Sequence, residues 1–269
     1  MKLGYLGPIG SYSYIAAKSY DSQADLIAFK SFYEIIKSVE NKTLDKGILP
    51  IENSTEGAVT SVMDGLLSTE RSNIIGEIVI PICHNIISSQ ESMENIEHIY
   101  SHIQAIEQCR EYFKSYYPNI LFTSCSSTSE ACRQAKDKGR GYAAIGNKES
   151  AELYGLNIVR ENIQDNILNQ TRFIIIGEDQ LVLGKRLKTS LAFSCLDDRP
   201  GLLYEVLREF AQRNINLTRI ESRPAKSEMG KYIFYIDFIG GRDEDIILEI
   251  LWHIKTTTDM LKVFGSYNY

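Results

Sequence analysis

The sequence predicts two α/β lobes followed by a smaller domain with a βαββαβ order. Three observations support this fold class. Short apolar runs alternate with amphipathic segments through residues 1–180, an order that is typical of parallel sheets covered by helices. Polar clusters follow several of these runs, at the edge where such sheets bind ligands. A charged, glycine-containing stretch at residues 178–188 then separates this part from the C-terminal strands and helices.

The first lobe consists of three apolar runs, each followed by a helical segment. The expected strands are residues 4–6, 25–29 and 48–51, and the expected helices are residues 11–20, 31–39 and 58–67. Ser11 or Ser13 can cap the first helix, whose free amides can also bind an anion. The third strand runs into the polar segment 52–57, which is either a ligand-binding turn or an elaborate helix cap.

A strand-rich stretch at residues 73–88, interrupted by Pro81, is expected to carry the chain into a second lobe. There the expected strands are residues 97–100, 119–123 and 141–145, and the expected helices are residues 101–116, a segment ending at 138, and residues 147–154. Polar side chains gather at residues 101–104 and 124–128, where two of these helices begin. Polar loops of two such lobes would face each other across a cleft, where small-molecule sites commonly lie.

The C-terminal segment predicts a ferredoxin-like domain. Its expected strands are residues 189–196, 215–221, 231–239 and 260–264, and its expected helices are residues 201–213 and 244–256. We therefore divide the chain into a first domain at residues 1–180, a linker at 181–188 and a second domain at 189–269. A βαββαβ unit is a common regulatory module, although the fold alone defines no function.

Composition excludes several functional classes. The formal net charge is −6 and no basic stripe occurs, which argues against nucleic acid as a partner. No apolar run is long enough for a membrane span or a signal peptide, so we expect a cytoplasmic protein without a membrane partner. The five cysteines include no C-x-x-C pair, which favours reduced thiols. His98 and His102 have the spacing of a metal pair, but a strand-to-helix junction is expected between them, so we predict no metal site.

The segment Asn169–Phe173 is the central candidate for a functional site. It lies between a polar loop and the apolar run 173–176, so it should enter a buried strand. Thr171 can donate one hydrogen bond, and Arg172 can bind a carboxylate through two parallel bonds. A plain strand start with a solvated arginine would have the same sequence. The polar clusters elsewhere make a site for an anionic small molecule the better interpretation.

Five short motifs occur in order along the chain: Gly4–Pro8, Leu49–Gly57, Ser101–Ala105, Asn169–Phe173 and Glu221–Pro224. Together they resemble the prephenate dehydratase family with a C-terminal ACT domain, over essentially the whole chain. The chain departs from the family pattern at Ile9, where a glutamate is usual, at Ser11-Tyr12-Ser13, and at Ile103, where a proline is common. Because the motifs begin at residue 4, we expect no chorismate mutase domain in front of them.

The resemblance implies a two-lobed catalytic domain like that of periplasmic binding proteins. It implies the decarboxylating dehydration of prephenate to phenylpyruvate, water and CO2, with no metal and no cofactor. The implied catalytic residues are Thr171, the donor to the leaving hydroxyl, Arg172, the carboxylate clamp, Phe173, packed beneath it, and Glu52. Glu52 and His102 could either tune protonation or form structural hydrogen bonds. The implied substrate-binding residues are Ser11, Asn53, Ser54, Thr55, Ser101, His102, Gln104 and Thr128.

The resemblance also implies that phenylalanine is an allosteric effector bound across an ACT–ACT interface, in a homodimer or homotetramer. The implied effector-binding residues are Gly201, Leu202, Leu203, Asn216, Leu217, Glu221, Ser222, Arg223 and Pro224. The helix start after Asp198 offers free amides to an amino-acid carboxylate. Two alternatives stay open. One is an arogenate dehydratase, which performs the same elimination on the amino analogue, and the other is a two-lobed amino-acid sensor without catalysis.

Overall fold

The computed structural model describes residues 1–178, 186–194, 200–225 and 231–269. Most of the predicted linker, the end of the strand predicted at 189–196, and both Asp198 and Arg199 lie outside the described residues. Cα packing divides the chain into two compact units. One comprises Met1–Ile35, Ile48–Val59 and Val79–Phe173, and the other comprises Ile36–Gly47, Thr60–Ile78 and Ile174–Tyr269. Within the described ranges, no helix is long and apolar enough to cross a membrane.

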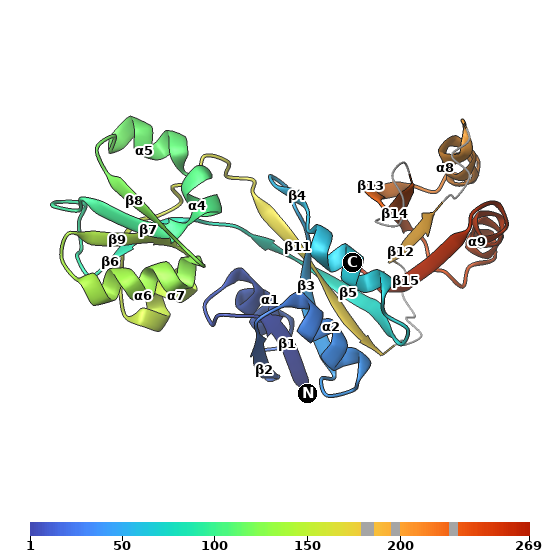
Figure 1. Cartoon of the computed structure of the whole chain (residues 1–269), viewed down its shortest axis with the longest axis horizontal. Helices are drawn as coiled ribbons and strands as arrows, with labels where there is room; N and C mark the ends of the chain where they lie inside the picture. Colours follow the sequence, from blue (N-terminus) through green and yellow to red (C-terminus); the bar gives the residue numbers. More distant parts are fainter. Residues whose placement is uncertain (179–185, 195–199, 226–230) are drawn as a thin grey trace. The chain divides into compact units, whose positions relative to one another are not determined.

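The first sheet has the strand order β2-β1-β3-β11-β5, with the short β4 paired to β3 (Figure 1). The elements of this part are β1 (Lys2–Leu6), α1 (Tyr12–Tyr20), β2 (Asp25–Phe29), α2 (Phe32–Glu40), β3 (Lys46–Asn53), β4 (Gly57–Ala58), α3 (Thr60–Leu67), β5 (Ser72–Pro81) and β11 (Gln170–Glu178). β1 and β2 are parallel, as the β-α-β order predicts. β1 and β3 carry runs of buried apolar residues, as expected for strands that are covered on both faces.

The starts of α1 and α3 show what the sequence predicted well and what it did not. Ser11 caps α1, because its Oγ accepts a hydrogen bond from the Tyr14 amide at 3.2 Å. The expectation that a helix begins at residue 58 is wrong. Ala58 instead pairs with Glu52 across the antiparallel β3–β4 hairpin, and α3 starts at Thr60. The polar segment after β3 is therefore the turn of a hairpin.

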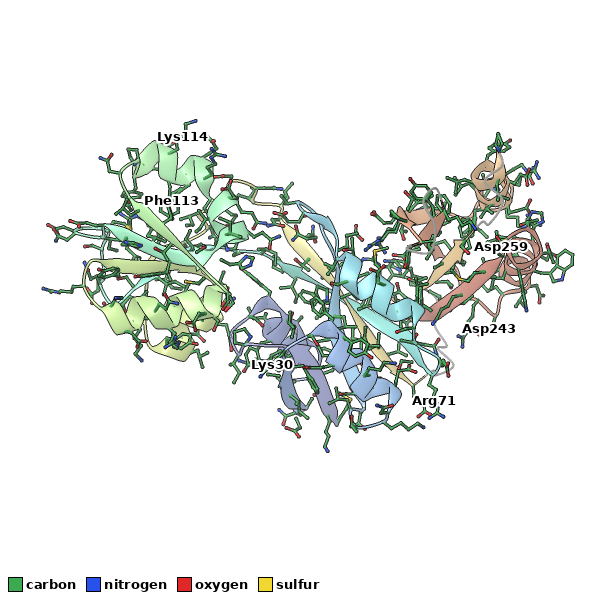
Figure 2. The ribbon with its side chains drawn as sticks, viewed as in Figure 1. Lys30, Arg71, Phe113, Lys114, Asp243 and Asp259 are labelled. Atoms are coloured by element: carbon green, nitrogen blue, oxygen red, sulfur yellow. The ribbon has the colours of Figure 1, made fainter. Side chains whose placement is uncertain are left out.

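The second sheet is mixed, with the strand order β10-β6-β9-β7-β8. Its elements are β6 (Asn85–Ser88), β7 (His98–His102), α4 (Ile103–Glu107), α5 (Arg110–Tyr116), β8 (Leu121–Cys125), α6 (Thr128–Lys138), β9 (Tyr142–Gly146), α7 (Lys148–Tyr154) and β10 (Asn157–Arg160). β7 lies parallel to β8 and β9, whereas β6 lies antiparallel to β9 and β10. In Figure 2, Phe113 of α5 can be followed into the core of this lobe, while the neighbouring Lys114 is exposed.

The single helix expected at residues 101–116 is wrong in two respects. Ser101 and His102 belong to β7, where they pair with Ser124 and Cys125 of β8. The helical residues that follow form two short helices, α4 and α5, separated at Gln108 and Cys109. His98 and His102 lie at opposite ends of one strand, and the described residues contain no group of side chains that could hold a metal ion.

The third sheet confirms the predicted βαββαβ order. Its elements are β12 (Leu187–Ser194), α8 (Leu202–Gln212), β13 (Leu217–Pro224), β14 (Tyr232–Ile239), α9 (Asp245–Thr257) and β15 (Met260–Asn268). The strand order is β13-β14-β12-β15, and each pair is antiparallel. The helices α8 and α9 cover one face of this sheet (Figure 1), and their apolar side chains form one core with those of β12 and β14.

Candidate active site

Thr171 lies at the start of β11, next to the end of β3 in the sheet, and is 8% exposed. The side-chain amide of Asn53, the last residue of β3, reaches it. Asn53 Nδ2 donates to Thr171 Oγ1 at 2.9 Å and to Asn169 Oδ1 at 2.9 Å. The β3–β4 hairpin and the entry of β11 therefore bring together three polar side chains that are far apart in the sequence.

The orientation of the Asn53 amide is set by the hairpin turn. Its Oδ1 accepts hydrogen bonds from the backbone amides of Thr55 and Glu56, both at 2.9 Å. This local turn geometry is typical of asparagine, and it aims Nδ2 at Thr171. Thr171 Oγ1 therefore accepts a hydrogen bond from the protein. A hydroxyl has one proton to donate, so the Thr171 proton is available to a different acceptor.

Arg172 points its guanidinium at the neighbouring strand. Its Nη2 donates to Glu52 Oε2 at 2.8 Å, and the two side chains are 12% and 39% exposed. Phe173, the next residue, is 1% exposed and belongs to the core. Thr171 and Phe173 thus face the interior, while Arg172 and Glu52 form a partly buried ion pair beside them.

A second layer of amides surrounds this cluster. Asn169 Nδ2 donates to Gln108 Oε1 at 3.1 Å, and Gln108 Nε2 donates to Glu56 Oε1 at 3.0 Å. The ring nitrogen Nε2 of His84 lies 2.8 Å from Gln108 Oε1. Burial lowers the pKa of His84, although its bond with Gln108 acts in the opposite direction. The neutral ring is therefore favoured.

Sequence reasoning did not assign a role to Gln108, Glu56 or His84. Gln108 follows Gln104 by one helical turn and ends α4, which is a weak signal by itself. His84 lies between β5 and β6, and it is held by its backbone amide, which donates to Gln164 Oε1 at 2.9 Å. Asn169 opened the central motif, but it was not among the predicted binding residues.

The other predicted site residues lie at helix starts and strand ends. Ser11 Oγ also donates to the Leu6 carbonyl at 3.1 Å, and the buried Ser101 hydroxyl donates to the Ile145 carbonyl at 3.0 Å. His102 Nδ1 accepts from the Gln104 amide at 3.3 Å and caps α4. Thr128 begins α6, which Ser127 caps. Within the described part of the chain, no hydrogen bond joins these residues to Thr171.

Two predicted binding residues in the hairpin turn contact the first residue of β11 and the loop before it. The Gln170 amide donates to Ser54 Oγ at 3.0 Å, and the Ser54 amide donates to the Gln170 carbonyl at 2.9 Å. Asn166 Nδ2 donates to Thr55 Oγ1 at 3.3 Å. The turn is therefore fastened to the β11 entry by backbone and side-chain bonds, which keeps Asn53 and Thr171 in register.

The predicted effector residues are divided between the start of α8 and β13. Gly201 precedes α8 with φ +91°, a left-handed conformation, and Leu202 is buried. Asn216 lies just before β13, and its carbonyl accepts from the Ile239 amide at 3.0 Å. Leu203 and Leu217 are partly buried against the core of the third sheet. On β13, Glu221 and Arg223 are half-buried, while Ser222 and Pro224 are exposed.

Arg223 has a partner that the sequence did not suggest. Its Nη2 lies 3.3 Å from Asp64 Oδ2 of α3, and its Nη1 is buried without a hydrogen-bond partner. Two further residues of the third sheet contact the residue before Asp64. Arg219 Nη2 donates to Met63 Sδ at 3.0 Å, and the Tyr235 hydroxyl donates to the Met63 carbonyl at 3.4 Å.

The structure defines a class of fold: two α/β lobes with a polar cluster at the entry of β11, followed by a ferredoxin-like βαββαβ domain. Comparison with known sequences gives the family. The sequence model of prephenate dehydratase matches residues 3–181, and that of the ACT domain matches residues 189–251. The chain belongs to the prephenate dehydratase family and carries an ACT domain, as its motifs predicted.

Relatives match along the whole chain. The prephenate dehydratase of Methanocaldococcus jannaschii is 40% identical over 270 residues, which cover 98% of this chain and 96% of the relative. The prephenate dehydratase of Lactococcus lactis subsp. lactis is 36% identical over 276 residues, which cover 99% of this chain and 97% of the relative. The crystal structure of a prephenate dehydratase from Arthrobacter aurescens in complex with L-Phe is 30% identical, with a TM-score of 0.91 and coverage of 100% of this chain and 90% of that one. These similarities confirm the predicted fold class.

Proposed function

We propose that the protein is a prephenate dehydratase that converts prephenate into phenylpyruvate, CO2 and water. The observation that carries the proposal is the geometry at Thr171, whose Oγ1 accepts from Asn53 Nδ2 at 2.9 Å. The Thr171 proton is thereby directed to another acceptor, and the leaving hydroxyl of the substrate is the acceptor that the reaction supplies. Turnover of prephenate by the purified protein, compared with arogenate, tests the proposal directly.

The reaction balances without an electron acceptor. The bond between the ring and its carboxylate breaks, CO2 leaves, and the electron pair moves into the ring as the ring hydroxyl departs. One proton converts the departing hydroxide into water, and the ring becomes aromatic. Hydroxide is a poor leaving group, so a hydrogen bond that strengthens as its charge develops lowers the barrier. Thr171 supplies that bond, while an ordinary hydroxyl is too weak an acid to be the source of the proton.

Arg172 binds a substrate carboxylate in this proposal, and Glu52 holds the guanidinium in place. Glu52 Oε2 accepts from Nη2 at 2.8 Å, which holds one arm of the guanidinium by a charge-assisted hydrogen bond. Phe173 anchors the strand in the core beneath the two polar residues. We further propose that the substrate contacts residues from the hairpin turn, from the start of α1 and from the α4 and α6 starts: Ser11, Asn53, Ser54, Thr55, Ser101, His102, Gln104 and Thr128.

Arg172→Lys is expected to raise KM about tenfold while changing kcat less, because lysine keeps the charge but not the two parallel bonds. A lysine can still pair with Glu52, so a purely structural role for Arg172 would survive the change. Initial-rate kinetics on the folded variant separate the two roles. An unchanged KM would assign Arg172 to the support of the strand and not to substrate binding.

We propose that residues 1–180 form the dehydratase domain and residues 189–269 the regulatory domain of a cytoplasmic homodimer or homotetramer. Phenylalanine is the proposed effector, bound across the interface of two ACT domains by residues at the start of α8 and on β13. An effector changes activity only through a difference in affinity between two states of the protein. A coupling free energy of about 1–3 kcal/mol would give inhibition of several-fold to about a hundredfold.

Helix α3 is the proposed route for this coupling. Its start follows directly on the β3–β4 hairpin that carries Asn53, and its residues Met63 and Asp64 contact Arg219, Tyr235 and Arg223 of the third sheet. Arg223 belongs to the motif on β13 that is proposed to bind phenylalanine. A shift of β13 on effector binding would therefore act on α3 and, through the continuous chain, on the hairpin.

A further inference from the structure

We propose that Glu56, at the turn of the β3–β4 hairpin, is a positioning residue that orients the Gln108 amide and, through it, the side chains of Asn169 and His84 beside Thr171. The inference rests on the proposed function, in which Thr171 donates to the leaving hydroxyl. Glu56 is exposed and lies in none of the predicted catalytic or binding sets. Its role follows from the order of donors and acceptors in the surrounding amides.

The direction of the network starts at the Glu56 carboxylate, which can only accept hydrogen bonds. Because Gln108 Nε2 donates to Glu56 Oε1 at 3.0 Å, Gln108 must turn its Oε1 to the opposite side. There Oε1 accepts from Asn169 Nδ2 at 3.1 Å and faces His84 Nε2 at 2.8 Å. A neutral His84 must then carry its proton on Nε2.

The orientation of Asn169 is also set independently by Asn53, at the other end of the network. Asn53 Oδ1 accepts from two backbone amides, whose role as donors is fixed, so Asn53 Nδ2 must donate to Asn169 Oδ1 and Thr171 Oγ1. The carboxylate and the backbone amides thus demand the same orientation of Asn169. A reversal of Gln108 would place the amino groups of Gln108 and Asn169 face to face, and it would leave a buried group unsatisfied.

Most of the network is buried, so it matters that its two ends require the same orientation of Asn169. Asn169 is 3% exposed, His84 is 2% exposed and Thr171 is 8% exposed, so water has little access to correct a mismatch. The exposed Glu56 is therefore the member of the network that can be replaced without opening the core.

Glu56→Lys is expected to lower kcat about tenfold with KM within about twofold, as for one disrupted hydrogen bond in the transition state. A lysine can only donate, so Gln108 must turn its carbonyl towards it and present its amino group to Asn169. Glu91→Lys is the matched control, because it changes the net charge equally at an exposed glutamate outside the network. It should leave kcat unchanged.

The decisive variant is the double change Glu56→Lys with Gln108→Glu. The new carboxylate at position 108 would accept hydrogen bonds from the new lysine, from Asn169 and from His84. Asn169 and His84 would then donate to residue 108 as they do in the parent protein. Gln108→Glu alone would place two carboxylates together and should be less active than the parent. We expect kcat of the double variant to exceed that of both single variants by several-fold, with thermal unfolding showing that all three proteins are folded.

Two results would overturn the inference: an unchanged kcat in Glu56→Lys, or a double variant no more active than the more active of the two single variants. The second result would mean that the Gln108 amide acts on the substrate itself. The proposed function is tested separately by Thr171→Ala. A fully active Thr171→Ala protein would reject Thr171 as the donor, whatever the behaviour of the Glu56 and Gln108 variants.

Discussion

Thr171→Ala is expected to lower kcat by roughly two to four orders of magnitude while changing KM little. The hydroxyl acts on charge that develops only as the carbon–oxygen bond breaks, so its loss affects the transition state more than the bound substrate. The structure adds a specific reason for a large effect. Asn53 already donates to Thr171 Oγ1, so in the parent protein the Thr171 proton is available to a different acceptor.

Two companion variants make this prediction specific. Thr171→Ser keeps the hydroxyl and should retain much of the activity, although it loses the methyl group that fixes the rotamer. Thr171→Val keeps the shape and loses the hydroxyl, so it should be as inactive as Thr171→Ala. A parental kcat in folded Thr171→Ala or Thr171→Val protein would show that another group donates to the leaving hydroxyl.

Gly201→Val is expected to abolish phenylalanine binding. It should therefore also abolish inhibition by phenylalanine, which we expect to be several-fold to about a hundredfold in the parent protein. Gly201 has φ +91°, a conformation that a β-branched residue adopts only with strain. An added Cβ would meet no atom of the described residues within 4 Å, so the change acts on the backbone turn and on the approach of a ligand. Calorimetry with phenylalanine and inhibition of prephenate turnover measure the two effects.

Asp64→Asn separates binding of phenylalanine from transmission of its effect. It removes the charge that pairs with Arg223 Nη2 at 3.3 Å but replaces none of the proposed effector-binding residues. We expect phenylalanine to bind with near-parental affinity while inhibition becomes weaker by several-fold. If Asp64→Asn is inhibited like the parent, α3 is not the route of coupling. If Gly201→Val still binds and responds to phenylalanine, the effector site lies elsewhere.

Local signals predicted much of the fold because they act within a few residues. Ser11 was predicted as one of two caps for α1, and the βαββαβ order of the C-terminal domain followed from its apolar periodicity. Non-local pairing caused the errors. Ser101 and His102 resemble a helix start in sequence, but they extend β7 because β8 offers them partners at Ser124 and Cys125. Ala58 likewise joins β4 because the hairpin returns to Glu52.

Some residues of the candidate site could likewise be predicted from the sequence, and others could not. Thr171, Arg172 and Asn53 lie in compact motifs of polar residues at strand ends, so the sequence alone drew attention to them. Gln108 ends a short helix, Glu56 lies in a turn and His84 lies between two strands. Each is unremarkable in its own segment. Their common role depends on the folding of three separate segments around Asn169, which no local pattern encodes.

Turnover of prephenate by the purified protein tests the central claim most directly. Phenylpyruvate and CO2 should each form in a ratio of one to one with the prephenate consumed, without added metal or cofactor. Arogenate should react more slowly under the same conditions. Faster turnover of arogenate would identify an arogenate dehydratase. If neither substrate is turned over by a folded protein that binds phenylalanine, the protein is a sensor and the proposed catalytic role of Thr171 is wrong.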